Sequence, residues 1–133
     1  MNAYNALASL AFLLLVAGWT QRKRTSRHVP LVLSGMALDL ALVVVLEVTR
    51  SVVEEVAGAK SHEPFSAMRQ WHIATSSLAV VLYVPTFVCG RRLWRRTEWP
   101  SPAAREAARK THAAFATSAL ALRAAGFVFM WLA

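Results

Sequence analysis

The segment AYNALASLAFLLLVAGWT, residues 3–20, is uncharged and as long as a membrane-spanning helix, and the basic segment QRKRTSRH, residues 21–28, follows it directly. A helix needs about 20 mostly apolar residues to cross the hydrocarbon core of a bilayer. Three further runs meet this requirement, at residues 29–49, 71–90 and 111–133. Because backbone polar groups in lipid must be satisfied within their own segment, all four runs are predicted to be helices.

The composition agrees with an integral membrane protein of one domain, residues 1–133. Of the 133 residues, 56% are hydrophobic and 17% are charged, and the mean hydropathy of +0.41 is high for a water-soluble domain. So much apolar material argues against disorder. The single cysteine, Cys89, excludes an intramolecular disulfide framework, a CxxC pair and a cysteine-rich zinc site.

The basic residues predict the orientation of the chain. Residues 21–28 hold four basic and no acidic side chains, residues 91–110 hold seven basic and two acidic, and residues 50–69 hold three of each. Connections rich in Lys and Arg stay on the cytoplasmic side. We therefore expect an antiparallel four-helix membrane bundle with both termini on the outer side. The formal net charge of +8 is then a topology signal, and no groove-reading motif points to nucleic acid.

Prolines and small residues add local expectations. Pro30 fits the first turn of the second helix, where its missing N–H costs nothing, whereas Pro85 lies inside the third helix and should bend it. Ser101 and Pro102 resemble an N-cap and first helical residue, so the fourth helix should begin there.

A stripe of small side chains runs along the fourth apolar run. Its members recur every four residues: Ala113, Thr117, Ala121 and Ala125. Because small residues allow two backbones to approach closely, this stripe is predicted to face a neighbouring helix.

Two charged residues lie near the centre of the predicted bundle. Asp39 follows His28 by eleven residues and Arg123 follows His112 by eleven, and both helices start from the cytoplasmic side. The two charges should therefore lie at the same depth and form a buried ion pair, since an isolated charge there costs at least about 2.5 kcal/mol. The pair either only locks two helices together or belongs to a polar stripe that lines a cofactor site or a proton path.

Three histidines are candidate cofactor ligands. His28 and His112 are predicted to lie level near the cytoplasmic face, and imidazoles from facing helices at equal depth can hold haem. His72 is a third candidate near the outer face, and Tyr83 follows it by eleven residues on the same helix. Copper or another metal ion is an alternative to haem. A bundle without any cofactor is the other reading, because a histidine at the interface needs no ligand.

A weak metal site can also be imagined on the outer side. Glu47 should lie at a depth comparable with His72, and His62 falls in the outer connection with several glutamates. Their spacing matches no recognised ligand motif, so a solvated acidic loop is the alternative. Enzyme templates are also missing: the chain has no HExxH pair, GxSxG elbow, P-loop or dinucleotide fingerprint. This favours a non-catalytic role.

Four short motifs resemble a small bacterial membrane family of unknown-function domains, some of whose members are linked to cytochrome c oxidase assembly (the CtaM-like group). They are TSRH (25–28), VTR (48–50), WHIATSSLA (71–79) and RKTH (109–112). The resemblance implies a four-helix protein of the bacterial inner membrane with functional histidines at His28, His72 and His112, together with Arg50. It further implies an accessory of the respiratory chain that handles haem or copper and contacts other membrane proteins of a respiratory complex.

Three functions remain open at this point. The first is a respiratory accessory that binds haem or a metal ion during maturation of a haem-copper oxidase. The second is a cofactor-free scaffold or small subunit of a larger membrane complex. The third is a small haem b protein that transfers electrons.

Overall fold

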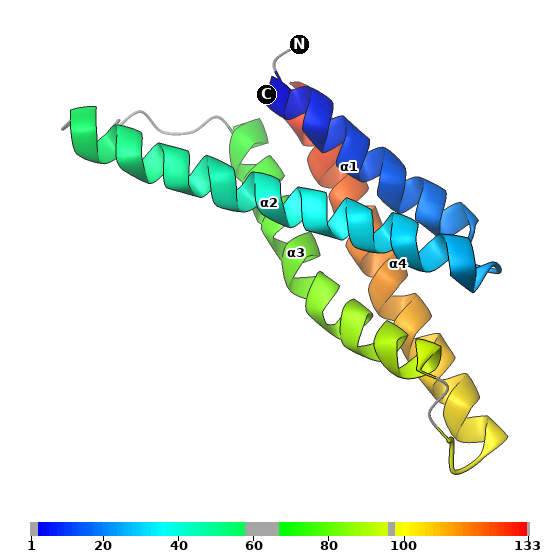
Figure 1. Cartoon of the computed structure of the whole chain (residues 1–133). Helices are drawn as coiled ribbons and strands as arrows, with labels where there is room; N and C mark the ends of the chain where they lie inside the picture. Colours follow the sequence, from blue (N-terminus) through cyan, green and yellow to red (C-terminus); the bar gives the residue numbers. More distant parts are fainter. Residues whose placement is uncertain (1–2, 58–66, 96–97, 133) are drawn as a thin grey trace. The chain divides into compact units, whose positions relative to one another are not determined.

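The described part of the chain folds into four α-helices, in agreement with the all-α prediction. The structure, a computed structural model, describes residues 3–57, 67–95 and 98–132, and it contains α1 (Ala3–Thr20), α2 (Thr25–Ala57), α3 (Ala67–Trp94) and α4 (Pro102–Leu132) (Figure 1). All four helices are long and apolar enough to cross a membrane. The chain divides into two compact units, Met1–Gln70 and Trp71–Ala133.

The first unit contains the hairpin of α1 and α2. The buried residues of α1 recur at intervals of three and four: Ala8, Ala11, Leu15 and Gly18. A Cβ on Gly18 would lie 2.5 Å from Cγ2 of Val32 and 3.1 Å from the Val32 backbone nitrogen, so the two helices touch here almost backbone to backbone. One helical turn further along the hairpin, Gly35 of α2 likewise packs closely against the side chain of Leu15 on α1. Since higher numbers on α2 meet lower numbers on α1, the two helices run in opposite directions.

The second helix begins earlier than the apolar pattern predicts. α2 starts at Thr25, four residues before the predicted boundary, and it continues to Ala57. Pro30 is therefore the sixth residue of the helix and lies beyond its first turn, contrary to our expectation. Without an N–H it cannot donate to the carbonyl of Ser26.

The second unit contains α3, from Trp71 onward, and α4. The rings of Trp71 and Phe129 lie 6.5 Å apart, and Gly126 packs against Ser76. The buried residues are Ala79, Tyr83 and Thr86 on α3 and Ala119, Arg123 and Gly126 on α4.

The packed face of α4 differs from the stripe of small residues predicted to make contact. Ala113, Thr117 and Ala121 of that stripe are exposed, and Ala125 is half-buried. Within this unit the contact of α4 with α3 falls on the face that carries Arg123, since small residues at every fourth position do not by themselves show which side of an apolar helix meets α3.

The fourth helix begins as predicted. The Ser101 hydroxyl accepts a hydrogen bond from the backbone N–H of Ala104 at 3.2 Å, and Pro102 is the first helical residue. Ser101 is thus a side-chain N-cap.

Replacing Ser101 with alanine is expected to destabilise the first turn of α4 by about 1 kcal/mol, because the N–H of Ala104 then loses its acceptor. Hydrogen exchange should show faster exchange at residues 103–106. Unchanged exchange would contradict a capping role. Ser118, an exposed serine in the middle of α4, provides the matched control, and its change to alanine should leave that exchange unaltered.

Candidate functional site

The three histidines named by the sequence share one hydrogen-bond arrangement. His28 is the fourth residue of α2, and its Nδ1 lies 2.7 Å from the carbonyl oxygen of Gly18 on α1. The close approach of the helices at Gly18 brings that carbonyl within reach of the imidazole. The ring of His28 is half-buried in the hairpin.

His112 makes the corresponding contact in the second unit. Its Nδ1 lies 3.1 Å from the carbonyl oxygen of Thr86 on α3. The ring lies beside Gly90, where a Cβ would come within 3.0 Å of Cε1. The absence of a side chain at Gly90 therefore leaves the space that the imidazole occupies.

His72 repeats the geometry of His28 more closely. Its Nδ1 lies 2.7 Å from the carbonyl oxygen of Gly126. A Cβ on Gly126 would meet Oγ of Ser76 at 2.6 Å and Oγ1 of Thr75 at 3.1 Å. The two units thus share one pattern. A buried glycine, Gly18 or Gly126, packs against the residues three and four positions after a histidine, and its carbonyl oxygen accepts a hydrogen bond from that histidine's ring.

These contacts define the tautomer of each neutral ring. A backbone carbonyl can only accept a hydrogen bond, so Nδ1 must carry the proton. The lone pair of the neutral imidazole is then on Nε2. A histidine that binds a metal or haem iron through Nε2 is commonly held by this same bond from Nδ1–H to a carbonyl oxygen. When neutral, each of the three rings therefore has the tautomer that such a ligand uses.

The second unit separates His72 from His112. On α3, Thr86, which accepts the hydrogen bond of His112, follows His72 by fourteen residues. On α4, Gly126, which accepts the hydrogen bond of His72, follows His112 by the same number. Fourteen residues of helix span about 21 Å. Two imidazoles on one ion have nitrogens only about 4 Å apart. His72 and His112 consequently cannot bind the same ion, and any shared site must pair one of them with a different residue.

Both charges of the predicted ion pair are buried. Asp39 on α2 is 2% exposed and Arg123 on α4 is 5% exposed. Arg123 donates from Nη1 to the hydroxyl oxygen of Ser76 at 3.2 Å, which places the guanidinium one turn from the contact between His72 and Gly126. Asp39 and Arg123 belong to different units, so their pairing stays a prediction.

The remaining sequence candidates are distributed as follows. Tyr83 is buried on α3, one turn before Thr86. The side chains of Glu47 and Arg50, and the whole of His62, lie outside the described residues. Within the described ranges no three His, Cys, Asp or Glu side chains are grouped closely enough to hold a metal ion. The outer metal site of His72, Glu47 and His62 therefore stays a prediction.

Sequence reasoning did not identify the partners of the histidines. Gly18, Thr86 and Gly126 act through backbone carbonyls, which every residue has, so residue type is a poor signal for them. The available clue was a glycine inside an otherwise regular apolar helix, a position that costs about 1 kcal/mol unless close packing requires it.

No family model, curated protein or solved structure matches this chain. The resemblance to the CtaM-like group therefore depends on the four short motifs alone.

Proposed function

We propose that the protein is a multi-pass protein of the bacterial inner membrane that holds haem between His28 and His112. Its placement in a membrane is supported by four helices of spanning length. Large apolar side chains on them are more than half exposed, including Leu13, Val44 and Val84 at 61%, 60% and 65%. A water-soluble monomer rarely exposes so many large apolar side chains to this degree, whereas lipid would cover them.

The topology proposed is an antiparallel bundle with both termini outside. If all four helices cross the membrane, the connections after α1 and after α3 lie on the same side. These two connections carry eleven of the fifteen Lys and Arg residues, which favours the cytoplasm for both. His28 and His112 then lie near the cytoplasmic face, and His72 lies near the outer face.

The depths of the two acceptor carbonyls support the pairing of His28 with His112. Gly18 precedes the first basic residue of its connection, Arg22, by four residues, and Thr86 precedes Arg91 by five. At 1.5 Å per residue these intervals are about 6 and 7.5 Å. The two acceptor carbonyls thus have similar spacings from their basic boundaries, which is the condition that the proposed pairing needs in a membrane.

The observation that carries the proposal is the Nδ1 hydrogen bond at each ring. It orients the imidazole and, in the neutral ring, puts the lone pair on Nε2, the nitrogen through which bis-histidine haem binding would take place. Apolar helix faces would exclude water from the ring system. When bound, haem would supply one-electron redox chemistry. Copper on the same imidazoles is the metal alternative.

The respiratory context rests on the sequence resemblance. It places the protein as a non-catalytic accessory in the maturation of a haem-copper oxidase, with other membrane proteins of a respiratory complex as partners. A small haem b protein that transfers electrons would use the same two histidines.

One observation favours a scaffold without a cofactor. His72 makes the same bond to a backbone carbonyl as His28, although it lies about 21 Å from His112. A histidine that simply joins two helices would look the same.

An absorption spectrum of the purified full-length protein separates these functions. Haem binding predicts a Soret band that His28→Ala and His112→Ala each abolish, because one remaining imidazole cannot hold the iron on both sides. Metal analysis of the same sample tests for copper. A spectrum that changes with a quinol or another reductant would identify the electron-transfer protein.

His72→Ala is the matched control, since it removes an identical hydrogen bond at the other end of the hairpin. It should keep the Soret band. A colourless, metal-free wild-type protein that still binds its partners would overturn the proposal in favour of the scaffold. Equal loss of the band in all three variants would show that folding, and not ligation, had been disturbed.

A further inference from the structure

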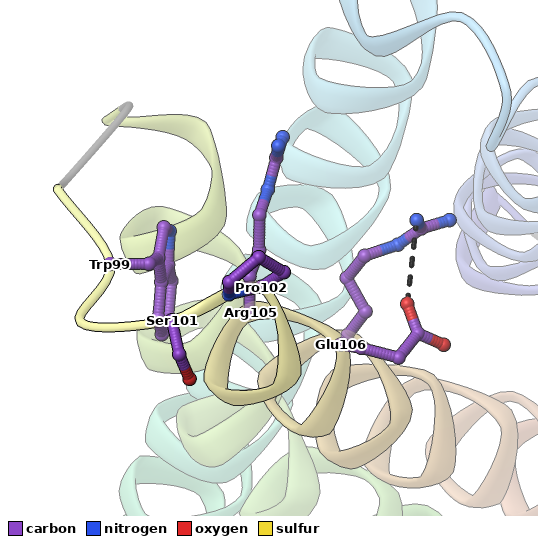
Figure 2. A pocket seen from close by; sticks show the side chains of 6 residues that line it. Trp99, Ser101, Pro102, Arg105 and Glu106 are labelled. Carbon is purple, nitrogen blue, oxygen red and sulfur yellow. Dashed lines mark ion pairs between the residues drawn. The ribbon is translucent and has the colours of Figure 1, made fainter.

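A shallow pocket lies where the residues before α4 meet its first two turns. It is lined by Trp99, Ser101, Pro102, Arg105, Glu106 and Arg109, and its volume is about 490 Å³ (Figure 2). All of these side chains except Trp99, which is half-buried, are exposed. The pocket is therefore open to a ligand that approaches from the surface, and it is separate from the three histidines.

The pocket has an excess of positive charge. It contains two arginines and one glutamate, and Oε2 of Glu106 lies 3.6 Å from Nη1 of Arg109 (Figure 2). With side chains 53% and 67% exposed, this ion pair contributes little to stability. The two guanidinium groups present up to ten N–H donors in planar forks that match the oxygens of a phosphate group.

Two of the main-chain donors in the first turn of α4, beside the pocket, have acceptors within the helix start. Pro102 has no N–H, and Ser101 accepts hydrogen bonds from Ala104 and Arg105 through its hydroxyl and carbonyl oxygens. An anion would therefore be bound by the arginine side chains and not by the end of the helix.

The position of the pocket along α4 corresponds to the headgroup layer of a membrane. The apolar part of α4 begins at Thr111, two residues after Arg109 and six after Arg105, which corresponds to about 3 and 9 Å. The headgroup region extends some 5 to 7 Å beyond the hydrocarbon on each side. The backbone of Arg109 falls inside this layer, and that of Arg105 falls about 2 Å beyond it, a distance that a long arginine side chain can span. Trp99 supplies the amphipathic ring that prefers this layer.

We propose that this pocket binds the phosphate group of an anionic phospholipid, with Arg105 and Arg109 as donors and Trp99 beside the glycerol. The cytoplasmic leaflet attracts basic segments through its anionic lipids, which agrees with the side assigned to this connection. The proposal rests on the membrane placement proposed above and is independent of haem.

The experiment measures lipid binding to the full chain by native mass spectrometry, with phosphatidylglycerol and phosphatidylcholine as probes. R105Q/R109Q is expected to bind phosphatidylglycerol roughly 30-fold more weakly than wild type, since each arginine that donates a charge-assisted hydrogen bond to the phosphate accounts for about fivefold or more in affinity. The control, R91Q/R95Q, removes the same charge from the same connection but does not line the pocket. Its affinity should change less than about threefold, because salt screens distant charges.

Glu106→Gln should change the affinity for phosphatidylglycerol in the opposite direction. Removal of the carboxylate that competes for Arg109 should strengthen phosphatidylglycerol binding roughly two- to fivefold. Equal losses in R105Q/R109Q and R91Q/R95Q would overturn the proposal, as would equal binding of phosphatidylcholine. Displacement of the lipid by inorganic phosphate would show a site for free phosphate and would also overturn it. Failure of the haem proposal would appear in the absorption spectrum and leave these affinities unchanged.

Discussion

Gly18→Ala is expected to destabilise the hairpin of α1 and α2 by about 2 kcal/mol, although alanine is the better helix former by about 1 kcal/mol. The new methyl group would lie 2.5 Å from Cγ2 of Val32 and 3.1 Å from the Val32 backbone nitrogen. The side chain of valine is stiff in a helix and a backbone atom cannot move alone, so the helices must separate. Thermal unfolding in detergent would measure the loss.

A second readout follows the histidine. Separation of the helices should lengthen the bond from His28 Nδ1 to the Gly18 carbonyl, and nitrogen NMR of the imidazole would report that change. Val32→Ala in the Gly18→Ala background removes the closest contact and should recover part of the stability. Gly126→Ala is the comparison, because its closest neighbours are two hydroxyl groups that can rotate and its nearest backbone atom is at 3.5 Å. A Gly18→Ala protein as stable as wild type would contradict the close packing of α1 on α2.

Arg123→Leu is expected to cost 3 to 5 kcal/mol and to lower the yield of folded protein sharply. This is the usual effect of removing one partner from a buried ion pair, since the other charge is left in an apolar interior. The expectation follows from the predicted pairing with Asp39 and from the burial of both side chains. The loss of folded protein would be measured as the fraction of monodisperse protein after extraction, and the loss of stability as the midpoint of thermal unfolding.

A double-mutant cycle tests the pairing itself. If Asp39 and Arg123 interact, D39N/R123L should be more stable than R123L alone, with a coupling energy of about 1 to 3 kcal/mol. Ser76→Ala is the control for the other contact of the guanidinium, because Ser76 accepts its Nη1 hydrogen bond. Additive losses in the cycle would contradict the pair. Recovery of stability without recovery of a Soret band would indicate that the charges serve the cofactor site as well as the fold.

Features with a strong local cause could be predicted from the sequence. The first span was predicted at residues 3–20 and α1 covers Ala3–Thr20, because a charged segment follows the apolar run directly. The start of α4 was predicted because Ser101 and Pro102 form a local capping pattern. The start of α2 was missed, since its first turn, TSRH, is polar and the apolar pattern begins only at Val29.

The rotation of each helix about its axis was beyond sequence reasoning. In a helix that is apolar on all sides, periodicity does not distinguish the face toward a protein neighbour from the face toward lipid. The stripe from Ala113 to Ala125 was therefore assigned to the contact, although Ala119 and Gly126 are the small residues buried there. For the same reason the histidines could be singled out as candidates, but the carbonyls that orient them could not be predicted.

The two histidine cross-links of the second hairpin limit how it can move. Because the bonds of His72 and His112 lie at opposite ends, a slide of α3 along α4 by one turn would carry both rings away from their acceptors at once. Piston-like displacement of one helix is thus opposed at two points. The two helices of this hairpin are therefore expected to tilt together, as one body.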